Sequence, residues 1–306
     1  MTVPDLARAS ARDVCRLCVA LTALSALTFS PVVGCGGSAF SAGGADGGTP
    51  ALDGGATSDG GTSGDEGGVR DGDTADAGPS YCALSGAQFE FCSDFDTGML
   101  IPPWEREVIA GTGASSKVDA TTSRSAPASL LMATAPNTAP SGGTYPQDNL
   151  LKTGIKKQNA QLQFDLDIER VSFGGSDAVS SVFVATIAQG PDYSVSLILR
   201  PPTSGNGNAA FSLAVLEVSG STPGSPRVLK PVPTLGVWSH FVVDLNFNAL
   251  QAVLSVQVDA NSSEKVSLSP SPGALATTSV RSLAVGVTVT GPVADYAARI
   301  DNVTYK

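Results

Sequence analysis

The sequence predicts an all-β protein, a two-sheet antiparallel β-sandwich or jelly roll preceded by a disordered linker. Three observations support this fold class. Short segments rich in β-branched and apolar residues recur along the chain, each bounded by Gly, Pro, Asn or Ser. Several of them alternate between apolar and polar residues, and no segment after residue 35 shows the apolar period of a long helix. Roughly a dozen strands in residues 81–306 are typical of a sandwich or jelly roll.

The clearest strand is predicted at residues 160–170, "AQLQFDLDIER". Successive side chains of a strand point to opposite faces, so one face of this segment is apolar and the other polar and acidic. Further strands are predicted at 180–188, 193–200, 211–219, 240–247, 251–260 and 282–290. In 160–170 the apolar face carries Leu162, Phe164, Leu166 and Ile168, and the polar face carries Gln163, Asp165, Asp167 and Glu169.

The first 34 residues have the features of an export signal. Three arginines precede an apolar stretch at residues 17–29, which is too short for a confident membrane span. The stretch leads into Val32-Val33-Gly34-Cys35, which resembles the lipobox of bacterial lipoproteins. The resemblance implies cleavage before Cys35, a diacylglyceryl group on its thiol and a membrane anchor, with Gly36 indicating the outer membrane or cell surface. The alternative is ordinary signal cleavage that leaves Cys35 as a thiol.

Residues 35–80 are predicted to be the lipidated cysteine and a flexible linker. The segment is made of Gly, Asp, Ser, Thr and Ala, and it cannot bury enough apolar surface to offset the entropy of ordering. Residues 36–80 carry one Arg, seven Asp and one Glu, so most of the net charge of −10 lies there. With no strongly basic region, nucleic acid is not expected as a partner.

The cysteines fit an oxidising compartment. Cys15 and Cys18 lie in the signal and Cys35 takes the lipid, which leaves Cys82 and Cys92 as a pair. We predict a disulfide between them. A metal site is the rival interpretation, although two thiols with no nearby histidine make a poor zinc site.

Residues 236–260 resemble the laminin-G and concanavalin A-like lectin and glucanase group. The matching residues are Gly236, Trp238, His240 and Val258-Asp259, with Ala260 in the place of the usual glycine. Residues 91–96, 102–107, 123–134 and 299–306 are similar to other segments of such jelly rolls. The resemblance implies the fold for residues 81–306, whereas lectins, lyases, hydrolases and adhesion modules all share that fold.

Four residues are candidates for catalysis. "FDLDIER" looks like the signature of retaining β-glucanases, in which two carboxylates of one strand act as nucleophile and acid/base. Asp165, one methylene shorter, stands where that signature has its nucleophilic glutamate; Asp167 and Glu169 follow. His240, the one histidine of the chain, is a candidate general base. The alternatives are an acidic solvent-exposed strand face and a structural histidine beside a core Trp238.

Candidate ligand sites are fewer. Many relatives in this group bind calcium, and Asp94, Asp96, Asp301 and Asn302 lie in the first and last strands, which are expected to pair. Their alternative role is hydrogen bonding at turns and strand ends. No cofactor is required, and Ca²⁺ is the one cation considered. Candidate platforms for stacking on a sugar are Trp104, Tyr145 and Tyr193.

The sequence thus predicts a membrane-anchored surface lipoprotein that binds carbohydrate without cleaving it. This function follows from the resemblance, because the residues alone do not identify a site. A glycan-cleaving hydrolase or lyase is the second hypothesis, and a structural or adhesive surface module is the third.

Overall fold

The computed structural model describes residues 80–85, 88–140, 144–155, 159–174, 180–190, 192–202, 210–220, 222–247, 252–261, 263–270 and 281–306. The predicted signal, Cys35 and the predicted linker up to residue 79 lie outside the described residues. Within the described part, no helix is long and apolar enough to cross a membrane. The one helix there is the single turn α2 (Tyr81–Ser85).

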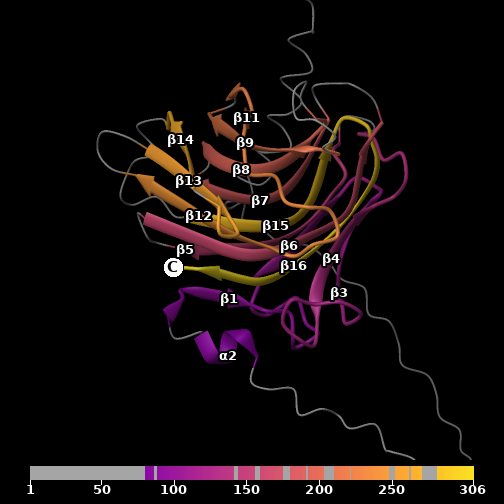
Figure 1. The fold of residues 1–306 in the computed structure, drawn as a ribbon, viewed down its shortest axis with the longest axis vertical. Helices are drawn as coiled ribbons and strands as arrows, with labels where there is room; N and C mark the ends of the chain where they lie inside the picture. The colour runs from indigo at the N-terminus through magenta and orange to yellow at the C-terminus, as the bar shows by residue number, and fades with distance from the viewer. Residues whose placement is uncertain are drawn as a thin grey trace, which may run out of the picture. The chain divides into compact units, whose positions relative to one another are not determined.

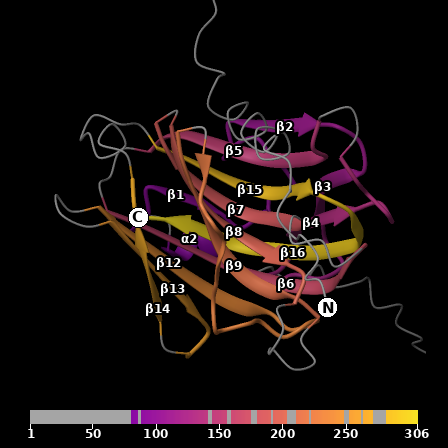
Figure 2. The ribbon, with the colours of Figure 1, turned by 90° about the horizontal axis from the view of Figure 1, so that it is seen from above.

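Two antiparallel sheets make up the rest of the described chain, which confirms the predicted fold class (Figures 1 and 2). Each sheet has eight strands among these residues. Sheet A runs in the order β14 (Glu264–Leu268), β13 (Ala252–Val258), β12 (Ser239–Phe247), β6 (Asn159–Phe173), β16 (Val293–Tyr305), β4 (Ser129–Thr134) and β3 (Ala114–Asp119), and β1 (Phe91–Ser93) also pairs with β16. Sheet B runs in the order β10 (Thr222–Pro223), β9 (Ser212–Ser219), β8 (Tyr193–Arg200), β7 (Ser181–Gln189), β15 (Arg281–Thr290), β5 (Gln147–Ile155) and β2 (Arg106–Ala110), and β11 (Arg227–Val228) also pairs with β9.

The core fills the space between the sheets with side chains from alternate positions of their strands. In β6 the predicted apolar face is fully buried, as the alternation requires. Phe164 of β6 stacks on Phe241 of the neighbouring β12, with ring centroids 4.9 Å apart. The core cluster reaches from Phe91 to Tyr305, so residues 80–306 contain the whole core found in the described chain.

Strands β7, β8 and β9 of sheet B are buried on both faces, which explains their nearly uninterrupted hydrophobic sequences. Their second face carries a separate buried cluster of Phe183, Ile198, Ala214, Leu216 and Val218. Burial on both faces removes the alternation that identified β6, since neither set of side chains faces water.

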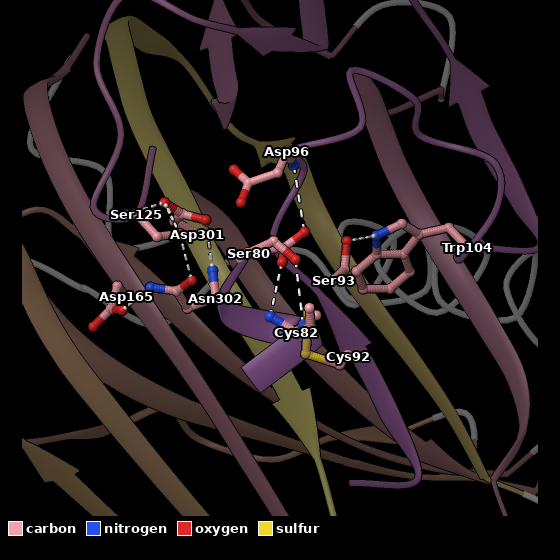
Figure 3. The surroundings of a disulfide bond; sticks show 12 residues. Ser80, Cys82, Cys92, Ser93, Asp96, Trp104, Ser125, Asp165, Asp301 and Asn302 are labelled. Atoms are coloured by element: carbon pink, nitrogen blue, oxygen red, sulfur yellow. Dashed lines mark hydrogen bonds between the residues drawn. A yellow bond between two sulfur atoms is a disulfide. The ribbon is translucent and has the colours of Figure 1, made fainter. Parts of the chain in front are cut away.

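The first and last strands pair, as the sequence predicts. Ser93 of β1 lies opposite Val303 of β16, and Phe91 lies opposite Tyr305. The predicted disulfide is also present: Cys82 of α2 and Cys92 of β1 form a bond with an S–S distance of 2.05 Å (Figure 3). The helix is therefore fixed to the edge of sheet A at the point where the described chain begins.

Candidate functional site

The candidate site lies on the outer face of sheet A, where the polar side chains of β6 meet those of β12 and β16. We call this surface the β6 face and define it by Asp165, Asp167, Glu169, His240 and Arg299. His240 lies opposite Asp165 on β12, and Arg299 lies opposite Asp167 on β16. The structure thus brings together the four catalytic candidates and adds an arginine that sequence reasoning did not single out.

Asp165 is held between its two neighbouring strands. Its Oδ1 lies 2.9 Å from His240 Nδ1, and its Oδ2 accepts a 2.8 Å hydrogen bond from Asn302 Nδ2. The hydrogen bond to Asp165 raises the pKa of His240, although partial burial opposes the rise. Ser125 Oγ donates in turn to Asn302 Oδ1 over 2.7 Å (Figure 3). Both carboxylate oxygens of Asp165 are therefore committed to bonds within the protein.

Glu169 is paired with Arg299. The Arg299 Nε lies 2.6 Å from Glu169 Oε1, and its Nη1 lies 3.2 Å from Asp119 Oδ2 on β3. Arg299 also donates to Thr121 Oγ1 over 3.2 Å, so its guanidinium ties three segments together. Because Arg299 is buried, removing its charge would leave Glu169 and Asp119 without their partner.

Asp167 lies between these two paired carboxylates and is itself buried. Burial raises its pKa; the negative charge of Glu169 adds to the rise, and Arg299 opposes it. Its Oδ1 is a buried acceptor with no hydrogen-bond partner among the described residues. An unpartnered buried acceptor is costly, so this atom is the one place on the β6 face where an added donor would be favourable.

The carboxylates that would form a retaining pair are bonded to different partners. Asp165 bonds to His240 and Asn302, and Glu169 pairs with Arg299. A retaining pair needs its two carboxylates about 5–5.5 Å apart. The expected solvent-exposed acidic strand face is not found either, because Asp165 and Asp167 are buried. Segment 121–128 lies beside them: Arg124 N–H donates to Asp301, and Thr121 Oγ1 accepts from Arg299, both on β16. On the α2 side, burial raises the pKa of Tyr81, and the negative charge of Asp165 adds to the rise.

Trp238 is half-buried, and the expectation that it belongs to the core is wrong. It follows a turn in which Val237 N–H donates to Thr234 O over 3.3 Å and Gly236 has a φ of 69°. Gly236 N–H donates to Ile168 O over 2.9 Å, which sets the turn against β6. Leu235 and Val237 of this turn are exposed apolar side chains. We call Leu235, Val237 and Trp238 the apolar turn.

Strand alternation places the Trp238 side chain on the β6 face. Ser239 of β12 is buried and lies opposite Leu166, so the residues on either side of it, Trp238 and His240, point outward. In the sequence "WSH" Trp238 and His240 are two positions apart, so strand alternation places them on the same face. This alternation could have placed Trp238 beside His240 from the sequence. The position of Trp238 continues the register of β12 to the place opposite Asp167.

Trp104 and Tyr193 are not platforms for a sugar, and these two expectations are wrong. Trp104 is 1% exposed, its Nε1 donates to Ser93 Oγ over 3.0 Å, and its ring packs edge-on against Phe91 at 4.6 Å. Tyr193 is buried, and its hydroxyl donates to Glu217 Oε1 over 2.9 Å. Tyr145 is half-buried and remains accessible in part.

Asp96, Asp301 and Asn302, three of the four candidate calcium ligands, lie close together at the junction of β1 and β16 (Figure 3), and the fourth, Asp94, is bonded to the N–H of Asp96. Asp94 accepts from Cys82 N–H at 2.8 Å and from Asp96 N–H at 3.4 Å. Asp301 accepts from the N–H groups of Arg124 and Ser125, at 2.9 Å each, and of Asn302 at 2.8 Å. The oxygens that calcium would need are thus occupied by protein donors.

Asp96 is the exception, because its Oδ2 is buried with no hydrogen-bond partner in the described chain. Burial raises its pKa to about 6, and the charge of Asp94 adds to the rise. No group of three or more His, Cys, Asp or Glu side chains in the described segments is arranged to hold a metal ion. The described contacts of the junction are hydrogen bonds between strands, and they leave Asp96 Oδ2 without a partner.

Comparisons with known proteins give likenesses of structure only. No protein-family model matches the sequence, and a search of curated proteins gives no match. The structure is similar to a cellulose-induced protein, Cip1 (TM-score 0.46, 14% identity, 71% of this chain and 97% of the other). It is also similar to an endo-β-1,4-glucuronan lyase from Trichoderma reesei (0.44, 13%, 71% and 94%) and to the lectin UEA-II complexed with galactose (0.38, 10%, 70% and 99%). At these identities and TM-scores the likenesses carry no argument about the activity of this chain.

Proposed function

We propose that this protein is an exported lipoprotein, held on a membrane by lipid on Cys35, whose sandwich binds a glycan at the β6 face without cleaving it. The glycan part of the proposal rests on one observation. A half-buried Trp238 shares a face with the imidazole of His240 and the carboxylate of Glu169. An aromatic ring offers an apolar surface to the C–H face of a sugar, and the polar groups beside it bond to hydroxyls.

The spacing of these groups suits one or two saccharide units. Trp238 continues the register opposite Asp167, and diagonal neighbours across a strand pair are about 7–8 Å apart, so Glu169 and Asp165 flank the ring. Arg170, with its side chain half in solvent, pairs with Asp295 at 2.9 Å on the other side of Glu169. The face therefore offers charged donors and acceptors around a single aromatic ring.

Binding without cleavage is favoured because two of the three carboxylates of the β6 face are bonded within the protein. Asp165 is bonded to His240 and Asn302, and Glu169 is paired with Arg299. General acid–base catalysis needs a group within hydrogen-bond reach of the substrate that can gain or lose a proton there. A hydrolase or lyase remains the alternative that the experiment below tests directly.

The anchoring part of the proposal rests on the sequence alone. Three arginines, a short apolar stretch and Val32-Val33-Gly34-Cys35 follow one another in the order of a lipoprotein signal. Lipid on Cys35 and the linker that follows would hold the sandwich within roughly 35–40 Å of a membrane, the r.m.s. span of such a chain. We accordingly place the protein at the outer membrane or cell surface.

A test of the glycan proposal uses residues 80–306 with the disulfide intact, because this fragment contains the whole core of the described chain. Retention on a panel of insoluble and immobilised polysaccharides is compared for the wild type, Trp238→Ala and Tyr145→Ala. Tyr145→Ala tests the other accessible candidate platform, a half-buried aromatic residue outside the β6 face, and a loss of retention there would place the glycan elsewhere. We expect retention on at least one glycan, a loss of about tenfold or more in affinity for Trp238→Ala only, and no new chain ends.

Two outcomes would overturn the proposal. Retention on no glycan would remove the binding function, and new reducing or unsaturated ends would show that the domain is an enzyme.

The second candidate function is an adhesive module for a protein partner. The exposed Leu235 and Val237 of the apolar turn favour it, because exposed aliphatic side chains beside a tryptophan are typical of protein contacts. Trp238→Ala would then weaken a protein complex and leave every glycan unaffected.

A further inference from the structure

The single turn α2 is attached to the outer face of sheet A, the face that carries the β6 face. Cys92 of β1 lies between Phe91 and Ser93, whose side chains are buried, so strand alternation points Cys92 outward. The Cys82–Cys92 disulfide therefore ties α2 to this outer face (Figure 3). A 2.8 Å hydrogen bond from Cys82 N–H to Asp94 Oδ2 is a second tie between the helix and the end of β1.

The strand register relates this attachment point to the site. Cys92 lies opposite Thr304 of β16, and Thr304 lies opposite Gln163 of β6. Residues directly opposite one another share a face of the sheet, and Gln163 belongs with Asp165 to the polar face of β6. Cys92 and Asp165 are therefore on one side of sheet A. In Figure 3, Asn302 of β16, which donates to Asp165, lies between Asp165 and the disulfide.

Tyr81 is the residue of α2 that reaches toward the site. It is the first residue of the helix, next to Cys82, and it is half-buried. The negative charge of Asp165 contributes to its raised pKa, after the larger effect of burial. Salt screens exposed charges beyond about 10 Å, so an effect of this kind indicates proximity. Tyr81 thus lies at the margin of the β6 face, with part of the residue accessible.

Tyr81 and Trp238 lie on opposite sides of Asp165. In sheet A, β12 and β16 are the two neighbours of β6, and β1 pairs with the edge of β16 that faces away from β6. Three strand spacings therefore separate β1 from β12, which is about 14 Å in total. Trp238 stands at the β12 end of this span and α2 at the β1 end, with Asp165 and His240 between them.

We propose that Tyr81 is a second aromatic contact of the glycan site, held in place by the Cys82–Cys92 disulfide, and that the site binds an oligosaccharide long enough to reach from Trp238 to Tyr81. Two rings with polar groups between them suit such a chain, because its sugars offer C–H faces to the rings and hydroxyls to the polar groups. The disulfide fixes α2 before the ligand arrives, so less conformational freedom is lost on binding.

This inference rests on the glycan part of the proposed function. The lipid anchor is a separate matter, which acyl labelling of Cys35 in the exported full chain tests.

The test compares oligosaccharides of two lengths. Isothermal titration of residues 36–306, in which α2 is not at the end of the chain, measures affinities for disaccharides and for long cello-, laminari-, xylo- and chito-oligosaccharides. The variants are Tyr81→Ala, Tyr81→Phe, Trp238→Ala and Leu84→Ala. Leu84→Ala is the matched control, because Leu84 is a residue of the same helix that has no ring and is 71% exposed.

We expect the wild type to bind at least one long oligosaccharide about tenfold or more tightly than its disaccharide. Tyr81→Ala is expected to remove this gain and to leave the affinity for the disaccharide unchanged, since truncating an aromatic contact typically costs more than 1 kcal/mol. Tyr81→Phe keeps the ring and Leu84→Ala keeps Tyr81, so both are expected to bind like the wild type. Trp238→Ala is expected to weaken binding of both lengths.

The role of the disulfide is tested by reduction, at a temperature at which circular dichroism shows both forms folded. Reduction is expected to weaken binding of the long oligosaccharide to the wild type about as much as Tyr81→Ala does, and to have no further effect on Tyr81→Ala. Cys82→Ser/Cys92→Ser gives the same comparison without reductant. An equal loss on reduction in Tyr81→Ala would contradict a disulfide that acts through Tyr81.

The outcomes separate this inference from the proposed function. If Trp238→Ala loses affinity while Tyr81→Ala binds both lengths like the wild type, Tyr81 is not part of the site, and the glycan proposal stands without it. If Tyr81→Phe loses as much as Tyr81→Ala, the hydroxyl and not the ring is responsible, which contradicts an aromatic contact. Binding of no oligosaccharide by the wild type would overturn both proposals.

Discussion

Asp301 makes the stability of this protein depend on pH in an unusual direction. Its carboxyl group is 0% exposed, and burial raises its pKa from 3.8 to about 7. The N–H groups of Arg124, Ser125 and Asn302 oppose that rise, and the charge of Asp96 adds to it. Between the two pKa values the folded protein keeps a proton that the unfolded chain has released. Unfolding then releases a proton, so the free energy of unfolding falls as pH rises from about 4 to about 7.

The size of the effect follows from the shift. Each pKa unit is worth about 1.4 kcal/mol, so a shift of about three units corresponds to a loss of about 4 kcal/mol over the whole range. About 2 kcal/mol of this loss falls between pH 5 and pH 7. Urea unfolding of residues 80–306, followed by circular dichroism at pH 5, 6, 7 and 8, measures it. The comparison is with Asp301→Asn, which cannot titrate, and with Asp192→Asn, an exposed aspartate between β7 and β8, as the control.

We expect the wild type and Asp192→Asn to lose stability in parallel from pH 5 to pH 7. Asp301→Asn is expected to be less stable at pH 5, because its amide NH2 cannot accept a hydrogen bond where an oxygen of Asp301 does, and to lose about 2 kcal/mol less than the wild type between pH 5 and pH 7. Equal slopes in all three proteins would refute the role of Asp301. A wild type that gains stability from pH 5 to pH 7 would mean that the three N–H donors outweigh burial.

Two further predictions concern the joints of sheet A. Reducing the Cys82–Cys92 disulfide, which closes a short loop of sequence separation 10, should lower the free energy of unfolding by about 3 kcal/mol, measured as the difference between urea midpoints with and without reductant. A change within experimental error would show that α2 and β1 are held by other contacts. Arg299→Met should cost about 3–5 kcal/mol, since it removes the buried partner of Asp119 and leaves Glu169 with Arg170 at 3.8 Å, whereas Arg170→Met, at exposed ion pairs, should cost about 1 kcal/mol or less. Equal costs for the two arginine variants would contradict the assignment of Arg299 as a buried link.

Local sequence patterns were sufficient for much of the fold. The alternation of β6 predicted its buried and polar faces, because a strand with one face in the core must repeat every two residues. Cysteine parity predicted the disulfide between Cys82 and Cys92. The pairing of the first and last strands was also predicted, although through the resemblance rather than through the residues themselves.

The environment of the site could not be predicted in the same way, because it depends on contacts between distant residues. Asp165 was expected to face solvent, but it is buried beside Asn302, 137 positions away in the sequence. Trp104 was a candidate platform but is buried, and Trp238 was assigned to the core but is half-buried. A single aromatic residue next to prolines or glycines has no period of its own, and only the anchoring of Trp104 by Ser93 and Phe91 decides its burial.

The most direct test of glycan binding at the β6 face uses the two tryptophans of the chain as reporters. Trp104 is buried and Trp238 is half-buried, so a soluble quencher such as acrylamide should report mainly on Trp238. The quenching constant is measured for residues 80–306 with and without a soluble oligosaccharide of a glycan that retains the protein. A bound sugar that covers the Trp238 ring should lower the quenching constant, because the ring then faces the sugar and no longer the quencher. An unchanged constant at saturating oligosaccharide would place the glycan elsewhere and contradict the assignment of the β6 face.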